Sequence, residues 1–178
     1  MVKMSIVNVV ATAALGQEVD LDDLGKHGEI LHDPEIYGGR VAYFSSPNTE
    51  GKVSIFVSGK MISVGTKSEA EAFCALECAK DFLVEKGYVK PVVLEKLVQN
   101  IVAVVDFEEN VNLERLAQDY KVIYEPEQFP GGIFRMEGQI RVTVLIYASG
   151  KAVIAGLRSA KDIVPLVQKL EGIIKAYT

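Results

Sequence analysis

This sequence of 178 residues has no long apolar run, few cysteines and no excess of positive charge. No uninterrupted apolar stretch approaches the roughly 20 residues that a membrane-spanning helix needs, so we expect no membrane partner. The N-terminal segment MVKMSIVNVVATAAL is apolar but is punctuated by Ser5, Asn8 and Thr12, and no basic region precedes a clean apolar core. This pattern is not that of a secretory signal peptide, and a soluble intracellular protein is the expectation.

The scarcity of cysteine and histidine argues against a metal site and against catalysis. Cys74 and Cys78 lie four residues apart in a helical pattern, and no further cysteine or nearby histidine completes a ligand set. We interpret them as buried, reduced thiols. His27 and His32 lie in a loop-like stretch without a partnered acid and nucleophile, and SGK lacks the upstream glycine of a phosphate-binding loop. We therefore expect no enzyme, no metal and no cofactor.

The charge balance is mildly acidic. The chain has 19 Lys and Arg against 24 Asp and Glu, which gives a formal net charge of −5. General nucleic-acid binders are usually strongly basic, so this balance argues mildly against one. Net charge does not fix the distribution of charge, and a basic rim is compatible with an acidic remainder.

An internal repeat covers nearly the whole chain. Asn8 in NVVA matches Asn100 in NIVA, at an offset of 92 residues, and later motifs match in the same order. From SGK onward the offset is 91, as from Gly65 to Gly156, because one loop of the first copy is one residue longer. The period is too long for a solenoid unit, so we expect a duplicated half-domain, with copies over 1–91 and 92–178 forming one continuous structural domain.

Each copy shows the same order of expected elements. A strand comes first, over 5–14 and 97–107, and a short helix follows, capped by Asp20 or Asn112. Four short strands come next, at about 29–33, 40–46, 53–58 and 61–65 in the first copy, with SGK as the tight connection between the last two. A long helix closes each copy, and its start in the first copy shows the capping-box pattern of Ser68 and Glu71.

The closing helices present apolar stripes. The stripe of the first consists of Ala72, Ala75, Leu76, Ala79, Phe82 and Leu83, and that of the second of Ile163, Val167, Leu170 and Ile174. Pro165 fits only a first turn, so the second helix is expected to begin nearer Asp162 than Ser159. Short connections without βαβ alternation predict an α+β fold in which an antiparallel sheet carries helices on one side.

The strands carry apolar residues at both alternating positions, which two long helices on one face cannot cover. The uncovered positions are Asn8, Val10, Phe56, Ile62, Val64, Asn100, Val102, Tyr147, Val153 and Ala155. Such an apolar face marks an interaction site, unless another subunit or the short helices bury it. The two matched asparagines favour a surface that reads hydrogen-bonding edges, because a buried amide without partners is costly.

These residues resemble the TATA-box-binding protein family, most closely its archaeal form. The resemblance covers essentially the whole chain, and its most specific segments are QNIVAVVD at 99–106, YEPEQFPGGIFRM at 124–136 and VLIYASGK at 144–151. IVNVVAT and SIFVSGKM carry it in the first copy. The resemblance implies a duplicated, saddle-shaped antiparallel sheet of about ten strands, with two long and two short helices on its convex face.

The resemblance further implies that the concave face binds the DNA minor groove and bends it. Four aromatic residues would part base steps: Tyr37, Phe56, Phe129 and Tyr147. We expect Phe129 to be exposed on its loop. Base contacts would come from Asn8, Asn100, Val10, Val102, Ile62 and Val153, and Val64 and Ala155 stand where the family usually has threonine. Rim contacts to phosphate would come from Lys60, Lys67, Arg135, Lys151 and Arg158. In the first copy Tyr43 stands at the counterpart of Arg135, and Arg40 nearby is the expected substitute.

The loop before Phe129 carries Glu125 and Glu127, which match the family's surface for transcription factor B. The resemblance therefore implies a general transcription initiation factor that bends A/T-rich promoter DNA and recruits transcription factor B and RNA polymerase. A divergent paralogue that binds DNA weakly and acts mainly through protein partners is the alternative. A homodimer in the absence of DNA, and a cytoplasmic location in an archaeal cell or a nuclear one in a eukaryote, are further expectations. The promoter preference and the bend stay open at this point.

Overall fold

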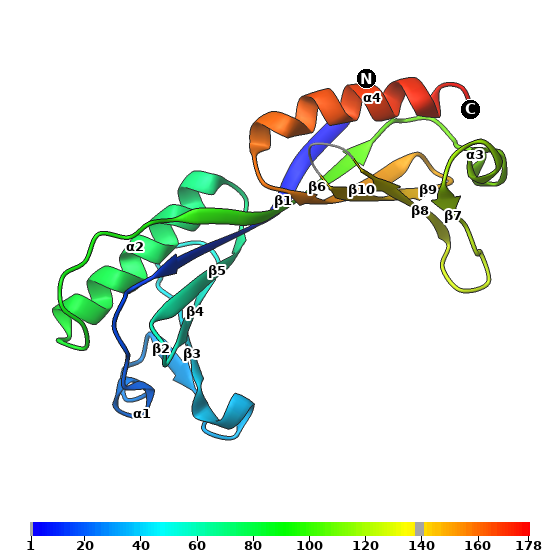
Figure 1. Ribbon diagram of the computed structural model, residues 1–178. Helices are drawn as coiled ribbons and strands as arrows, with labels where there is room; N and C mark the ends of the chain where they lie inside the picture. The colour runs from blue at the N-terminus through cyan, green and yellow to red at the C-terminus, as the bar shows by residue number, and fades with distance from the viewer. Residues whose placement is uncertain (1, 138–140) are drawn as a thin grey trace. The chain divides into compact units, whose positions relative to one another are not determined.

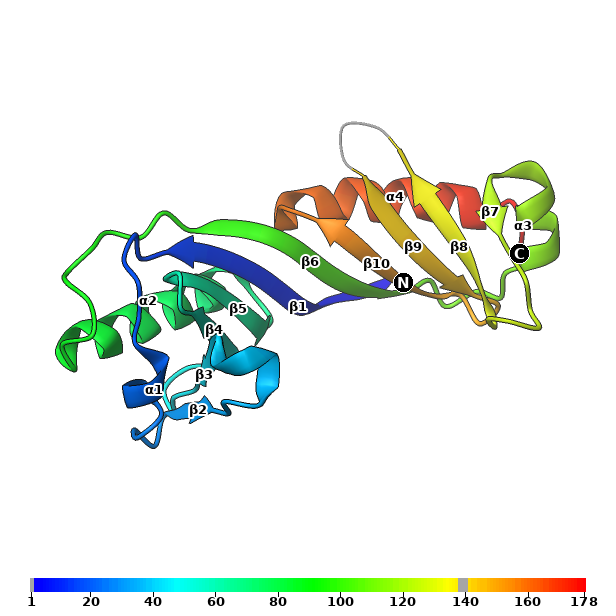
Figure 2. The same ribbon diagram turned by 60° about the horizontal axis from the view of Figure 1, so that its bottom comes forward.

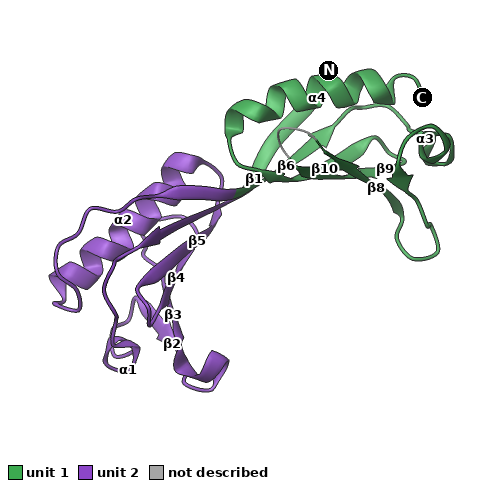
Figure 3. Cartoon of the chain, in the orientation of Figure 1, with its two compact units in different colours: residues 1–7, 100–178 green, residues 8–99 purple. Residues whose placement is uncertain are grey.

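The computed structural model describes residues 2–137 and 141–178. The chain forms two compact units, coloured separately in Figure 3. Unit 2 consists of residues 8–99, and unit 1 consists of residues 1–7 and 100–178. Most of the first copy of the repeat lies in unit 2 and most of the second copy in unit 1.

The elements follow the same order in the two copies. Those of the first copy are β1 (Lys3–Ala14), α1 (Leu21–Leu24), β2 (Ile30–His32), the 3-10 turn η1 (Ile36–Gly39), β3 (Val41–Phe44), β4 (Lys52–Phe56), β5 (Lys60–Thr66) and α2 (Glu69–Glu85). Those of the second are β6 (Leu97–Asp106), α3 (Leu113–Asp119), β7 (Val122–Ile123), β8 (Gly131–Met136), β9 (Val142–Tyr147), β10 (Lys151–Leu157), the 3-10 turn η2 (Ala160–Asp162) and α4 (Ile163–Ile174).

The described strands pair in the order β2-β3-β4-β5-β1-β6-β10-β9-β8-β7. Every pair whose register is given is antiparallel. The expected α+β class, with about ten antiparallel strands, two long helices and two short ones, is confirmed. None of the helices in the described residues is long and apolar enough to cross a membrane.

The helix starts follow the expected capping residues, with one difference. Asp20 and Asn112 accept hydrogen bonds from backbone N–H groups in the first turns of α1 and α3. Ser68 Oγ accepts the N–H of Glu71 at 3.1 Å. The carboxylate of Glu71 accepts the backbone N–H of Lys67 at 2.9 Å, one residue before the position that a capping box uses. The reciprocal bond that we expected at Ser68 is therefore shifted to its neighbour.

The start of α4 agrees with the position of Pro165. The helix begins at Ile163, immediately after η2, so that Pro165 stands in the first turn. A proline is tolerated there because the N–H groups of the first turn have no partner within the helix.

Figures 1 and 2 show α2 and α4 each lying against one face of the strands of its own unit. The buried residues of α2 are Ala72, Ala75, Leu76, Ala79 and Leu83, and those of α4 are Ile163, Val167, Leu170 and Ile174. Phe82 is half-buried and packs its ring against that of Phe44 at a centroid distance of 5.3 Å. The apolar stripes are thus the faces that build the core.

The two cysteines differ from expectation. Cys74 is exposed and Cys78 is half-buried, and both are free thiols. A residue two positions after Ala72 lies about 200° around the helix, away from the buried stripe, which explains the exposure of Cys74. Partial burial raises the pKa of the Cys78 thiol, and the neighbouring Cys74 raises it further.

Strand positions alternate between the helix-covered side and the other side. In β1, Val9, Ala11 and Ala13 are buried, whereas Asn8, Val10 and Thr12 are half-exposed. We call the side of the strands away from α2 and α4 the open face. This alternation is what an antiparallel sheet with one covered face requires.

Candidate nucleic-acid interface

The ten uncovered strand positions named above lie on the open face of their units. All are half-buried apart from Val64, whose side chain is 36% exposed. Register supports this placement within each unit, because directly paired residues of antiparallel strands share a face. Ile62 pairs with Thr12 and with Ser54, and Val153 pairs with Val104 and Leu145.

The open face also carries hydroxyl groups that sequence reasoning missed. Thr12 and Ser54 lie beside Ile62, and Thr143 pairs with Ala155. Thr12 Oγ1 accepts a hydrogen bond from the side-chain amide of Gln99 at 2.9 Å. The two-residue alternation of the strands predicts that these three residues share the open face, whereas the family motifs do not single them out.

Asn8 and Asn100 occupy equivalent places beside a β-bulge. The register of β1 with β5 shifts near Gly65, and that of β10 with β6 shifts near Gly156. Both glycines have positive φ, at 85° and 100°. Asn8 Oδ1 accepts the N–H of Gly65 at 2.8 Å, and Asn100 Oδ1 accepts the N–H of Gly156 at 2.7 Å.

These bonds fix the orientation of each amide, because a backbone N–H can only donate and must therefore face the oxygen. The amide nitrogen, which carries two N–H donors, is the group that each asparagine offers to a ligand. A bulge needs an acceptor for its displaced N–H, so each asparagine also stabilises the local fold. The same side chain thus has a structural role and a donor role.

In the second copy, Phe129 of the loop between β7 and β8 packs against Tyr147, the last residue of β9. The rings of Phe129 and Tyr147 are 5.8 Å apart between centroids and tilted by 59°. Tyr147 pairs in register with Gly131, where an added Cβ would lie 2.9 Å from the Phe129 ring and 3.0 Å from the carbonyl oxygen of Ile146. Only glycine leaves room for this packing. Phe129 is half-buried, not fully exposed as we expected, because Tyr147 covers part of its ring.

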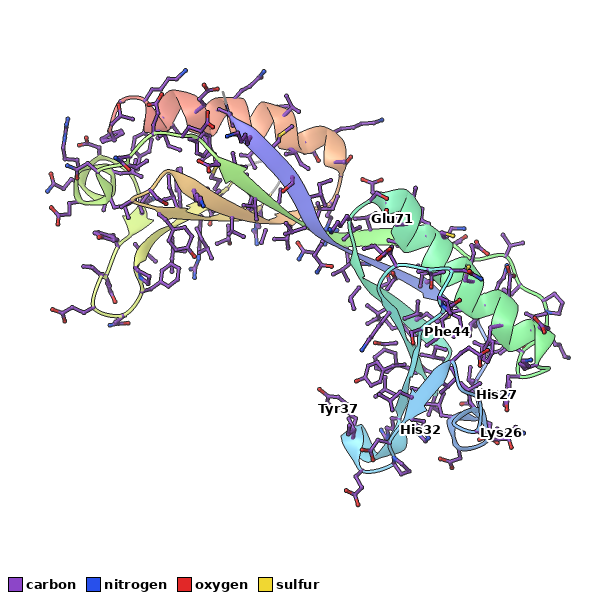
Figure 4. All side chains as sticks on the ribbon, turned by 180° about the vertical axis from the view of Figure 1, so that it is seen from behind. Lys26, His27, His32, Tyr37, Phe44 and Glu71 are labelled. Carbon is purple, nitrogen blue, oxygen red and sulfur yellow. The ribbon has the colours of Figure 1, made fainter. Side chains whose placement is uncertain are left out.

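The matching loop of the first copy has a different backbone. Tyr37, Gly38 and Gly39 all have positive φ, at 51°, 62° and 73°. Tyr37 is 77% exposed, and Figure 4 shows its side chain at the end of the loop, with His32 nearby. His32 Nε2 donates to the carbonyl oxygen of Gly39 at 2.9 Å and so braces the loop. A left-handed tyrosine is strained, which distinguishes this loop from its counterpart.

The acidic residues of the second loop are exposed. The backbone carbonyl of Glu125 accepts the N–H groups of Gln128 at 2.9 Å and Phe129 at 3.0 Å, which closes a tight turn. The side chains of Glu125 and Glu127 both reach solvent. In the first copy, the backbone carbonyl of Asp33 accepts the N–H of Ile36 at 3.1 Å and closes the equivalent turn, and Asp33 Oδ1 also accepts the N–H of Glu35 at 2.9 Å.

The six cations expected at the rim are all exposed: Arg40, Lys60, Lys67, Arg135, Lys151 and Arg158. Lys60 and Lys151 open β5 and β10 on the same side as Ile62 and Val153, two residues further along. Arg135 pairs with Thr143, which places it on the open face as well. The equivalent residue of the first copy, Tyr43, lies beside Ser54 and is half-buried.

His27, which we expected to lack a partnered acid, belongs to a hydrogen-bonded chain. Its Nε2 donates to the hydroxyl of Tyr88 at 3.0 Å, and that hydroxyl donates to Asp23 Oδ2 at 2.6 Å. Hydrogen bonds from Lys26 and then from Tyr88 lower the pKa of the Asp23 carboxyl. These hydrogen bonds could not be predicted from the sequence, because Tyr88 lies 61 residues away from His27. Within the described residues no group of three or more His, Cys, Asp or Glu is placed to hold a metal ion.

Comparison with known proteins agrees with this geometry. The family model described as transcription factor TFIID, or TATA-binding protein, matches the chain twice, over residues 3–85 and 95–177. A TATA-box-binding protein of Cenarchaeum symbiosum is 38% identical over 159 residues, which is 89% of this chain and 86% of that protein. One from Methanococcus aeolicus is 35% identical over 176 residues, covering 97% of this chain and 94% of its own.

A solved structure shares the fold. The TATA-binding protein of Methanococcus jannaschii superposes with a TM-score of 0.84 at 32% sequence identity, covering 98% of this chain and 99% of that one. The two family matches fall on the two copies that the repeat defines. By sequence and by structure, the chain belongs to the TATA-box-binding protein family of DNA-binding transcription factors and not to a family of enzymes.

Proposed function

We propose that this protein binds A/T-rich promoter DNA through the minor groove, bends it, and recruits transcription factor B and RNA polymerase. The observation that carries the proposal is the pair of asparagines. Each holds a bulge N–H with its oxygen and keeps two donors on the open face, at equivalent places in the two copies.

Donors on an otherwise apolar face suit the minor groove of A/T-rich DNA. A·T and T·A pairs both show acceptors there, N3 of adenine and O2 of thymine, whereas a G·C pair adds the projecting amino group of guanine. The asparagine amides supply donors to those acceptors. The apolar neighbours Val10 and Val102 would leave a guanine amino group without a hydrogen-bond partner, which disfavours G·C.

Bending would come from the aromatic side chains at the loops. Apolar wedges between base steps kink DNA in the family's established mode of minor-groove binding. Phe129 and Tyr147 form a packed pair that is ready to act as such a wedge, with Phe56 and Tyr37 at the other copy. Pyrimidine–purine steps such as TA kink most easily, so deformability adds selectivity beyond the direct base contacts.

The exposed carboxylates of Glu125 and Glu127 suit a protein partner rather than DNA, because they would repel phosphates. We assign this loop to transcription factor B, which in turn brings RNA polymerase. The protein itself contributes binding and DNA geometry, and no chemical step.

A divergent paralogue with weak DNA preference is favoured by two observations. Tyr37 is held in the left-handed region on a loop unlike its counterpart. Val64 and Ala155 present no hydroxyl to the bases, although Thr143 lies beside Ala155.

Fluorescence anisotropy separates the two candidates. Labelled duplexes with a TATA-like site and with a G/C-rich site are titrated with and without transcription factor B, and resonance energy transfer between the duplex ends reports bending. Preference for the TATA-like duplex together with a bend supports the first function. Equal binding to both duplexes even with the partner present would rule it out and leave the paralogue. Recovery of binding in Tyr37→Phe would trace the weakness to that loop.

A further inference from the structure

A groove of about 690 Å³ lies in the second copy, along the sheet edge formed by β7 and the end of β8. Its apolar lining includes Tyr120, Phe134, Met136 and Ile173, contributed by the end of α3, by β8 and by α4. Figure 1 shows α3, β7 and β8 at the same end of unit 1. The volume is in the range of ligand-binding clefts.

The equivalent position of the first copy carries one more ring from the long helix. Phe134 pairs with Val122 and Val144 as Phe44 pairs with Ile30 and Val53, so these two rings are equivalent. Ile173 corresponds to Phe82 at the offset of 91. The rings of Phe44 and Phe82 meet at 5.3 Å, and His27 packs edge-on against Phe82 at 5.5 Å. Figure 4 shows Phe44 and His27 beside α2. The copies therefore differ at this place, since Ile173 stands where the first copy has the ring of Phe82.

The charge at this place has also changed between the copies. Lys121 and Lys169 line the groove, where the first copy has Glu29 and Cys78. Both lysines are exposed, and neither makes an ion pair within the described part of the chain. Arg135 adds a third cation and Glu137 a single carboxylate, so the lining is basic in a chain whose net charge is −5.

The floor of the groove is fixed by aromatic contacts. The ring of Tyr120 packs against Phe134 at 6.0 Å and against Tyr177 at 5.9 Å. The hydroxyl of Tyr177 donates to Asp119 Oδ2 at 2.9 Å, and the Arg115 guanidinium lies over the Tyr177 ring. A surface held in this way changes little on binding, which lowers the entropic cost of docking a partner.

We infer that this groove is a docking site for an acidic segment of a partner protein that inserts one large apolar side chain between Tyr120 and Ile173. Charge complementarity selects the occupant. Carboxylates flanking the anchor would pair with Lys121 and Lys169, while the anchor fills the space beside Ile173 that the Phe82 ring occupies in the first copy. The site goes beyond the proposed DNA-binding function, since Arg135 is the one residue of its lining that is also an expected DNA contact.

The test uses the full-length protein without DNA and a short fluorescein-labelled peptide in which Asp and Glu alternate with Leu and Phe. Anisotropy measures its affinity for wild type, for Ile173→Phe, which restores the ring of the first repeat, and for Lys121→Glu/Lys169→Glu. Lys161→Glu, an exposed lysine of η2 outside the groove, is the matched control. Two further peptides replace the acids by Lys, or Leu and Phe by Ala.

We expect wild type and Lys161→Glu to bind the acidic peptide equally well. The filled and the charge-reversed variants should each weaken binding roughly tenfold or more, as loss of a central anchor or of a charged pair does. The lysine peptide and the alanine peptide should bind weakly to all proteins. Thermal unfolding of each variant checks that it is folded. If the added ring overpacks the site and unfolds the protein, the comparison of wild type with Lys121→Glu/Lys169→Glu decides.

Equal affinity of the acidic peptide for wild type and the charge-reversed variant would overturn the proposal. Equally tight binding of the lysine peptide would do the same. A third contrary result is that Lys121→Glu/Lys169→Glu weakens binding of a labelled duplex as much as that of the peptide, because the lysines would then serve DNA phosphates.

Discussion

At the scale of the residue, Asn8 and Asn100 connect the fold to the DNA-binding proposal. The oxygen of each amide completes the β-bulge at Gly65 or Gly156, and its nitrogen faces away from that bond. An asparagine in an apolar strand looks costly in the sequence alone. In the structure the amide oxygen has a hydrogen-bond partner, so only the N–H donors still need one, and a ligand can supply it.

Replacing both asparagines by aspartate separates the two roles. The carboxylate still accepts the bulge N–H, so the free energy of unfolding should change by less than about 1 kcal/mol. The donors are lost and a negative charge faces the groove acceptors, so affinity for A/T-rich DNA should fall at least about tenfold. Urea unfolding and anisotropy measure the two effects. Loss of stability with unchanged DNA affinity would show that the asparagines are structural only.

Phe129→Ala tests the wedge of the second copy. Phe129 is half-buried against Tyr147, so truncation should cost about 2 kcal/mol of folding stability, from the ring pair and the partly buried apolar area together. Energy transfer across a labelled duplex should show that the bend is largely lost. A variant that unfolds instead would mark Phe129 as a core residue and refute its assignment as a wedge.

At the scale of the element, the spacing of apolar residues and the helix-capping residues predicted most of the helices and strands. The caps at Asp20 and Asn112, the alternation of the strands and the stripes of α2 and α4 are local features that the sequence carries directly. The shifted bond of Glu71 and the left-handed Tyr37 were not predicted, because each depends on side-chain rotation or backbone detail that no pattern encodes. The exposure of Cys74, in contrast, could have been predicted from the helical period. The hydroxyls of Thr12, Ser54 and Thr143 could have been found from strand alternation alone.

Helix α2 gives a pH-dependent prediction through Glu77. Hydrogen bonds from Lys80 and then from Lys96 lower the pKa of the Glu77 carboxyl below its ordinary value of 4.5. A lowered folded-state pKa stabilises the fold above the ordinary value, and that contribution is lost as the pH falls below it. Urea midpoints should therefore fall less steeply with acid in Glu77→Gln than in wild type. Glu85→Gln, an exposed site on the same helix, is the control and should follow wild type.

At the scale of the whole molecule, the acidic net charge and DNA binding are reconciled by where the charges lie. Six exposed cations border the strands of the open face or follow them, although acidic residues outnumber basic ones in the chain as a whole. The sequence predicted the duplication and the family, because matched residues at a fixed offset survive divergence. It could not predict the groove of the second copy, since that depends on how Met136 and Ile173 pack across elements.

The rim cations predict a salt dependence of DNA binding. Each phosphate that is neutralised contributes about 0.9 to the slope of log affinity against log salt, so six contacts set an upper limit of about 5. Lys151→Ala should make the slope shallower by about 0.9 and weaken all duplexes alike. Lys161→Ala should leave the slope unchanged. A slope that is the same in wild type and Lys151→Ala would remove Lys151 from the DNA contacts.

The central claim is that the open face reads the minor groove, and inosine tests it most directly. An I·C pair lacks the guanine amino group, so it resembles A·T in the minor groove and G·C in the major groove. We predict that a duplex whose TATA-like site carries I·C for A·T binds nearly as tightly as the A/T original, whereas the G·C version binds far more weakly. Anisotropy titration of the three duplexes decides. If the I·C duplex binds as weakly as the G·C duplex, the minor-groove account is wrong.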